Sequence, residues 1–146
     1  MADFKSLTPE QIVTVLNERA GIGLPGTLGL RVVDCGRGWL EMSMEVGERH
    51  MAPNGYLHAG AVVTLADSAC GLGCTISLPD DATGFTTIEL KSNFLGTALS
   101  GRLICRAEAA HLGGSTQVWD AKVVSEESGK TIAMFRCTQM VLKKRT

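Results

Sequence analysis

The chain has 146 residues, of which 45% are hydrophobic and 20% charged, and its 14 basic and 15 acidic side chains give a formal net charge of −1. This composition is typical of a globular protein, so we expect residues 1–146 to form a single domain with its own core. It excludes collagen-like, disordered and disulfide-rich secreted proteins, and the lack of a basic cluster outside the last few residues argues against nucleic acid as a partner.

The first predicted elements are a short helix and a hairpin. Residues 8–11 read Thr-Pro-Glu-Gln, which combines an N-cap, a proline at the first helical position and a capping-box glutamine. A helix should therefore begin there and end near Ala20. Residues 29–35 and 39–46 read as two strands around a tight turn, because apolar and polar side chains alternate in the second of them.

The second half of the chain predicts one long helix followed by a sheet. Residues 59–77 are apolar or small on nearly all sides, which is typical of a helix surrounded by protein. Strand-like runs separated by turn-forming segments follow at 85–94, 102–110, 116–125 and 131–142. We therefore expect an α+β fold in which a curved antiparallel sheet of about six strands wraps around one long helix.

Cysteine usage and the apolar segments bear on location and cofactors. The five cysteines form no Cys-x-x-Cys pair and none has a histidine at zinc-ligand spacing. They predict small buried hydrophobic side chains rather than a metal or redox site. The N-terminus lacks the apolar run of a signal peptide, and the most apolar stretch contains Asp67. We expect a cytoplasmic protein with no membrane span, no metal and no cofactor.

The segment around the start of the long helix carries the candidate chemistry. A helix that begins at Ala59 offers free backbone N–H groups and a positive dipole end beside His58, and such a terminus can stabilise negative charge on a carbonyl oxygen. Asp67 lies inside the apolar helix, where an isolated carboxylate costs several kcal/mol. Each has a structural alternative. His58 could satisfy a loop carbonyl, and Asp67 could bond a serine or threonine neighbour.

The spacing of these residues predicts a site made by two chains. Eight residues separate Ala59 from Asp67, which at ~1.5 Å per residue is about 12 Å along one helix. A carboxylate and an N–H group that far apart cannot act on the same small group. If both act on one substrate, a two-fold dimer must bring Asp67 of one chain against Ala59 of the other. The run at 85–94, as an exposed edge strand, is the expected pairing site.

This segment resembles the signature of the hot-dog-fold acyl-CoA thioesterases, in particular the phenylacetate-degradation branch. That signature is similar to Asn-x-x-Gly-x-x-His-Gly-Gly followed by a helix containing Leu-Ala-Asp, and the matching positions here are Gly55, His58, Gly60, Leu65, Ala66 and Asp67. Two positions depart from it. Ala59 replaces the first glycine after the histidine but keeps its N–H group, and Ala52 replaces the asparagine that helps to position the thioester.

The resemblance implies a role for each matching residue. Asp67 would be the nucleophile or the general base that activates water, and the N–H of Ala59, beside His58, would polarise the thioester carbonyl. Thr87 matches a hydroxyl that helps to hold the water or the carboxylate. The substrate-binding residues would be those of the loop before the helix and of a later glycine-containing turn that could meet CoA: Asn54, Gly55, Gly60, Gly113, Gly114 and Ser115.

The function that follows is hydrolysis of an acyl-CoA or aryl-CoA to the free acid and CoA. The acyl group would lie beside the helix at the dimer seam, against apolar side chains such as Leu57, Val62 and Leu65. The alternatives are a non-catalytic acyl-CoA-binding module, which the Ala52 departure favours, and an enoyl thioester hydratase or dehydratase, for which the His50 to Asp67 spacing is a poor match. The family further implies a homodimer and a dimer of dimers.

Overall fold

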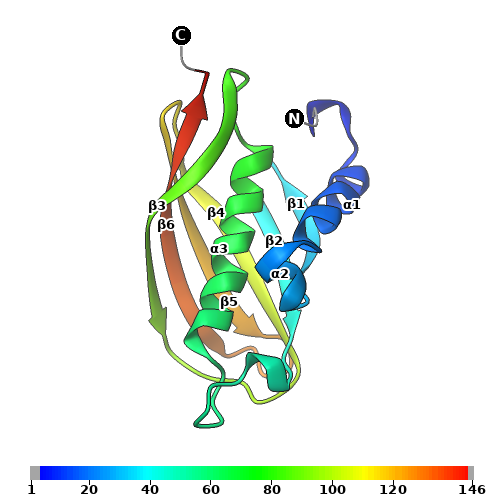
Figure 1. Cartoon of the computed structure of the whole chain (residues 1–146), viewed down its shortest axis with the longest axis vertical. Coiled ribbons are helices and arrows are strands. Elements are labelled where there is room, and N and C mark those ends of the chain that lie inside the picture. The colour runs from blue at the N-terminus through cyan, green and yellow to red at the C-terminus, as the bar shows by residue number, and fades with distance from the viewer. Residues whose placement is uncertain (1–3, 145–146) are drawn as a thin grey trace.

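The computed structural model describes residues 4–144 and contains one six-stranded antiparallel sheet. The strands lie in the order β1-β2-β4-β5-β6-β3. Their bounds are β1 Arg31–Gly36, β2 Trp39–Glu45, β3 Ala82–Phe94, β4 Arg102–Leu112, β5 Thr116–Ser125 and β6 Thr131–Lys143. The sheet curves around helix α3, Ala59–Ile76, as Figure 1 shows. The predicted α+β architecture, with one long helix and about six strands, is confirmed.

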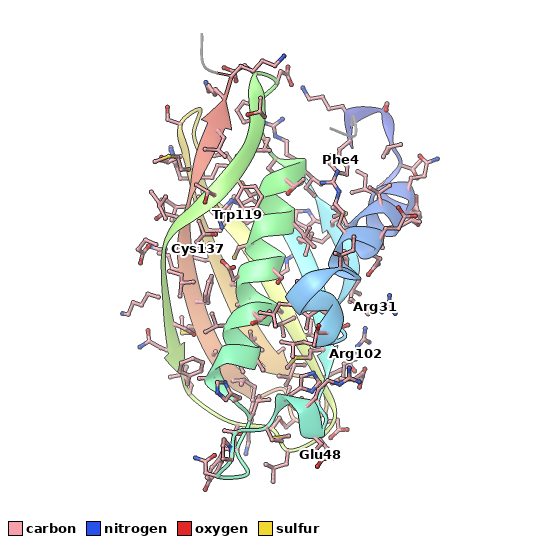
Figure 2. The ribbon with its side chains drawn as sticks, in the orientation of Figure 1. Phe4, Arg31, Glu48, Arg102, Trp119 and Cys137 are labelled. Carbon is pink, nitrogen blue, oxygen red and sulfur yellow. The ribbon has the colours of Figure 1, made fainter. Side chains whose placement is uncertain are left out.

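The core lies between α3 and the concave face of the sheet. Trp119 and Cys137 are fully buried there, on the face that the helix covers (Figure 2). Glycine allows this close approach, because a Cβ atom at Gly73 would lie 2.7 Å from the Trp119 ring. All five cysteines are free and buried, as predicted.

Helix α1, Pro9–Ala20, closes the β1 edge of the sheet. Its predicted capping box is present: the Gln11 N–H donates to Thr8 Oγ1, and the Thr8 N–H donates to Gln11 Oε1. Asn17 Nδ2 donates to the Val32 carbonyl at 2.9 Å, and the Val32 N–H donates to Asn17 Oδ1 at 2.9 Å. The amide of Asn17 thus takes the place of a neighbouring strand.

Replacing Asn17 by alanine is expected to destabilise the fold by about 1–3 kcal/mol, because two backbone groups of Val32 lose their partners next to the core. Urea unfolding followed by far-UV circular dichroism measures the effect. Thr14→Ala is the matched control on the same helix, since the Thr14 hydroxyl bonds only the Glu10 carbonyl in its own helix. An Asn17→Ala variant as stable as Thr14→Ala would contradict this role.

The other edge of the sheet is β3, which pairs with β6 on one side and has no strand on its outer side among the described residues. Three large apolar side chains along it are 43–51% exposed, namely Ile88, Leu90 and Phe94. In Figure 1 this strand lies on the far side of α3 from α1, and its outer edge is uncovered. Open backbone groups and exposed apolar side chains are the features of a strand that pairs with another chain.

The structure departs from the sequence analysis in three respects. A second short helix, α2, Gly23–Thr27, was not predicted. Helix α3 is not surrounded by protein within one chain, because half of its residues form a flank that is only partly buried or exposed. By length and composition α3 could also cross a bilayer, but its buried face packs against the sheet. Val62 and Leu65 lie on that face and are 2% and 0% exposed, so they line no open tunnel.

Candidate active site

Asp67 lies in the middle of α3 with its carboxyl group turned into a half-buried position. Its Oδ1 atom is buried and has no hydrogen-bond donor among the described residues. An unpartnered buried acceptor costs about 1–3 kcal/mol, so natural proteins retain few of them. Among described residues, Asp67 is the only one with such a side-chain atom. The position of Asp67 therefore indicates a functional rather than a stabilising carboxyl group.

The surroundings of Asp67 disfavour its charge. Burial raises the pKa of the carboxyl group above its ordinary value, and the hydroxyl of Thr87 opposes part of that rise. Thr87 comes from β3, the strand after the helix, so the structure brings these two predicted residues together. A carboxyl group with a raised pKa is a stronger base once it is ionised, which suits it to take a proton from water.

A pocket of about 190 Å³ opens beside Asp67. Its wall is mainly apolar and also holds one guanidinium group, one carboxyl group and two hydroxyl groups. The lining residues come from α1, α2, α3 and β3: Arg19, Ala20, Pro25, Asp67, Ser68, Gly71, Leu72, Phe85 and Thr87. Gly71 lies against the Phe85 ring, because a Cβ atom there would be 3.1 Å from Phe85 Cζ. A small or flat apolar group could therefore lie next to the carboxylate.

The N-terminus of α3 forms the second half of the candidate site. His58 is the N-cap, and its Nδ1 accepts a hydrogen bond from the Gly60 N–H at 2.8 Å. Nδ1 therefore carries no proton, and Nε2–H remains as a donor. The neighbouring Ala59 N–H has no acceptor among the described residues. Gly60 is required for this geometry, since a Cβ atom there would lie 2.9 Å from His58 Nδ1.

Within one chain the two halves open into different cavities. His58 and Gly60 line a separate pocket of about 320 Å³ with residues of the α2 segment, among them Leu24 and Leu28. Asp67 is not among its lining residues, in agreement with the ~12 Å that separates Ala59 from Asp67 along the helix. One chain therefore presents a carboxylate in one place and an anion-stabilising helix terminus in another.

The loop before α3 is a closed turn. The Ala52 N–H donates to the Tyr56 carbonyl and the Gly55 N–H donates to the Ala52 carbonyl, while Gly55 adopts a φ of +81° that favours glycine. Asn54 Oδ1 accepts from the Tyr56 N–H at 3.2 Å. Asn54 and Gly55 thus shape the loop, and neither lines a described pocket.

The predicted CoA turn at Gly113, Gly114 and Ser115 joins β4 to β5. A Cβ atom at Gly113 would lie 2.7 Å from the Thr116 carbonyl oxygen, so the tight turn itself requires glycine. This turn lies toward the end of the sheet where α3 terminates, because Gln117 just beyond it donates to the Ser77 carbonyl. Within one chain it is not brought together with His58, and its role in binding stays a prediction.

One residue of the site was not predicted. Gln139 of β6 is fully buried, and its Oε1 accepts from the Thr87 hydroxyl at 2.8 Å. Its Nε2 donates to Cys137 Sγ at 3.3 Å. The available signal was a lone amide on the inward face of an apolar strand, alternating with exposed residues such as Met140.

A larger hollow, of about 670 Å³, lies on the opposite face of the sheet. Lys91, Asp120 and Arg136 contribute to its lining. Asp120 and Arg136 are joined in a bidentate ion pair, and they alternate along their strands with the buried Trp119 and Cys137. The candidate chemistry therefore lies on the helix side of the sheet, away from this larger hollow.

Comparisons with known proteins identify the family and the fold of the chain. The family model described as thioesterase superfamily matches residues 54–132, which include both halves of the site. A 1,4-dihydroxy-2-naphthoyl-CoA hydrolase of Listeria monocytogenes is 38% identical over 85% of this chain and 99% of that protein. A thioesterase of Pseudomonas aeruginosa superposes with a TM-score of 0.86 at 31% identity, covering 95% of this chain and 98% of that one.

The PaaI protein from the phenylacetic acid degradation operon of Escherichia coli shares the fold, with a TM-score of 0.79 at 22% identity over 92% of this chain and 96% of that one. The resemblance to hot-dog thioesterases stated from the sequence is thereby confirmed. Family match, identity and fold agree over most of the chain. The chain belongs to the thioesterase superfamily and is a thioester hydrolase.

Proposed function

We propose that the protein hydrolyses an aryl-CoA or acyl-CoA in a site shared by two copies of the chain. Asp67 of one chain activates the nucleophile or is itself the nucleophile. The partner's Ala59 N–H, next to the partner's His58, accepts the negative charge that develops on the thioester oxygen. CoA thiol and a free carboxylic acid leave as products.

The observation that carries this proposal is the buried, unpartnered Oδ1 of Asp67 beside an open pocket. A structural carboxylate at this depth would have donors, whereas a reacting one must keep a lone pair free. The free N–H of Ala59 supplies the complementary group. Backbone donors of this type typically contribute about 10²–10³-fold to an acyl-transfer rate.

Pairing through β3 supports the shared site. The open edge and the exposed Leu90 and Phe94 would be covered by a second copy. A two-fold axis at this edge would set the two α3 helices antiparallel, so the middle of one approaches the start of the other. The same axis creates two equivalent sites per pair. A further dimer of dimers stays an expectation from the family.

Two routes use Asp67. As a general base it takes a proton from water, the water oxygen bonds to the carbonyl carbon, and the C–S bond breaks as the proton passes to the CoA sulfur. As a nucleophile its oxygen bonds to the carbonyl carbon and expels CoA thiolate, and water then cleaves the mixed anhydride. A single turnover in ¹⁸O-labelled water that puts label into Asp67 would identify the second route.

The pocket beside Asp67 favours an aromatic acyl group. Its apolar wall from Pro25, Leu72 and Phe85, with the Arg19 guanidinium at one side, suits a flat ring that carries a polar substituent. The name of the Listeria relative, a hydroxylated naphthoyl-CoA hydrolase, supports the same class.

Release of free thiol from a panel of CoA thioesters tests this function. We expect hydroxybenzoyl-CoA and hydroxynaphthoyl-CoA to exceed straight-chain acyl-CoAs of similar carbon number by about tenfold or more in kcat/KM, the range that pocket contacts can supply. Equal rates for all classes would contradict the aromatic preference. Tight binding of every ester without release of thiol would favour the non-catalytic binding module.

A further inference from the structure

The hydroxyl of Thr87 lies between two groups that could each take its single proton. One is the Asp67 carboxyl group, whose pKa the hydroxyl helps to lower. The other is Gln139 Oε1, which accepts the Thr87 proton at 2.8 Å. A hydroxyl donates one hydrogen bond. Because the proton is directed to Gln139, the Oδ1 atom of Asp67 is left without a donor.

A second hydrogen bond fixes the orientation of the Gln139 amide. Its Nε2 donates to Cys137 Sγ at 3.3 Å, which leaves Oε1 for Thr87. Cys137 also lies close enough to Cys70, one turn beyond Asp67 on α3, to raise the pKa of the Cys70 thiol. The amide is fully buried and cannot exchange these partners for water. A chain of side chains therefore runs from the core to the candidate catalytic carboxylate.

Resting on the proposed function, we propose that Gln139 is a positioning residue: it accepts the Thr87 proton, limits the hydrogen bonding of that hydroxyl to Asp67, and so leaves Oδ1 of Asp67 without a donor. Gln139 does not touch the substrate pocket, whose lining includes Thr87 and Asp67 but not the amide. It acts through Thr87 alone. Without it, the hydroxyl would turn to Asp67 and stabilise the carboxylate, which would weaken the base.

Few other charged or titratable groups of the same chain face Asp67 and could shift its pKa. From α1, Arg19 carries a positive charge; the α2 segment contributes only Pro25, and β3 contributes the uncharged Phe85. On α3 itself Cys70 interacts with Asp67. The neighbouring Cys137, together with burial, raises the pKa of the Cys70 thiol well above its ordinary value, so this thiol stays neutral.

Behind these groups lie two further thiols, Cys137 of β6 and Cys105 of β4. Burial raises the pKa of the Cys105 thiol. The partner's His58, which the proposed function places at the same site, is the other titratable group there. The inference is therefore decided by the carboxyl ¹³C titration described below, which reports Asp67 alone.

The test is the variant Gln139→Met, which keeps the length and apolar bulk of the side chain but removes the acceptor. The freed Thr87 proton should pass to Asp67. A hydrogen bond to a charged group is of a strength that corresponds to roughly one or two pKa units. We expect the acid limb of the kcat/KM profile to move at least about one unit lower, together with a fall in the pH-independent rate.

A matched control lies directly opposite in the sheet. Gln117 of β5 pairs with Gln139 and is equally buried, but its amide bonds Trp119 Nε1 at 3.0 Å and the Ser77 carbonyl at 3.1 Å. Gln117→Met should lower the melting temperature without moving the acid limb. In a Thr87→Val background, Gln139→Met should also leave the limb unchanged, because the intermediate hydroxyl is missing.

Carboxyl ¹³C NMR titration of Asp67, assigned by its loss in Asp67→Asn, separates this inference from the proposed function. It reports the pKa of Asp67 whether or not the protein hydrolyses a thioester. A lower Asp67 pKa in Gln139→Met supports the inference even if no thioester is hydrolysed. An unchanged or higher pKa overturns it, even if hydrolysis is fast.

Discussion

Replacing Asp67 by asparagine is expected to lower kcat/KM for thioester hydrolysis at least about a hundredfold, because the amide can neither attack the carbonyl carbon nor take a proton from water. Thiol release from an aryl-CoA measures the loss. Asp120→Asn is the matched control: Asp120 lies on the opposite face of the sheet, paired with Arg136. An Asp67→Asn variant with unimpaired turnover would remove this residue from the mechanism.

The same substitution should make the folded protein more stable at neutral pH. Burial raises the folded-state pKa of Asp67 above its ordinary value of 3.8. Such a group contributes stability that is fully present below the unfolded pKa and is lost as pH rises through the folded pKa. Asparagine cannot ionise, so the melting temperature of the variant relative to wild type should rise across that window. A constant difference would show that Asp67 is not desolvated.

Replacing Ala59 by proline should be nearly as damaging, although no side-chain chemistry is lost. Proline removes the N–H group but is tolerated at the first helical position. His58 before it already has the extended conformation that proline requires, with φ −67° and ψ 128°. We expect a fall of about 10²–10³-fold in hydrolysis, the loss seen when one oxyanion donor is removed. Ala59→Gly, which keeps the N–H, is the control and should remain active.

Mixing these two damaged proteins tests whether the site is shared. In a pair formed from one Asp67→Asn chain and one Ala59→Pro chain, one site carries both substitutions and the other carries neither. Refolding equal amounts together should recover about a quarter of the wild-type rate, since about half of the pairs are mixed and each has one intact site. Recovery that never exceeds the sum of the parents would mean that both groups act within one chain.

The parts of the fold that the sequence predicts are those whose signals are local. The capping box starts α1, the alternation in residues 39–46 defines β2, and the absence of polar faces marks α3. Helix α2 was missed because residues 23–27 contain two glycines and a proline, a composition typical of turns. Residues distant in sequence instead stabilise α2: Arg49 Nη1 donates to the Thr27 carbonyl, and His50 Nε2 bonds the Leu28 carbonyl.

The candidate site divides in the same way. Asp67 and His58 could be found because a carboxylate in an apolar helix and a histidine at its start are conspicuous in sequence. Gln139 could not be found, since it meets Thr87 only through the β3–β6 ladder, across 52 positions of sequence. The bulge in β3 between Thr87 and Glu89 adds a register shift that no alternation rule supplies.

The amide of Asn17 also limits how the protein can polymerise. The Asn17 side chain occupies the β1 edge of the sheet. A strand from another molecule can therefore be added only at the β3 edge. Two molecules that meet there through a two-fold axis use up both of their open ends, and no third can be added. Such a pair would be closed, whereas molecules with two open edges could join into a ribbon that lengthens. A substitution at position 17 is therefore expected to promote fibre formation as well as to destabilise the fold.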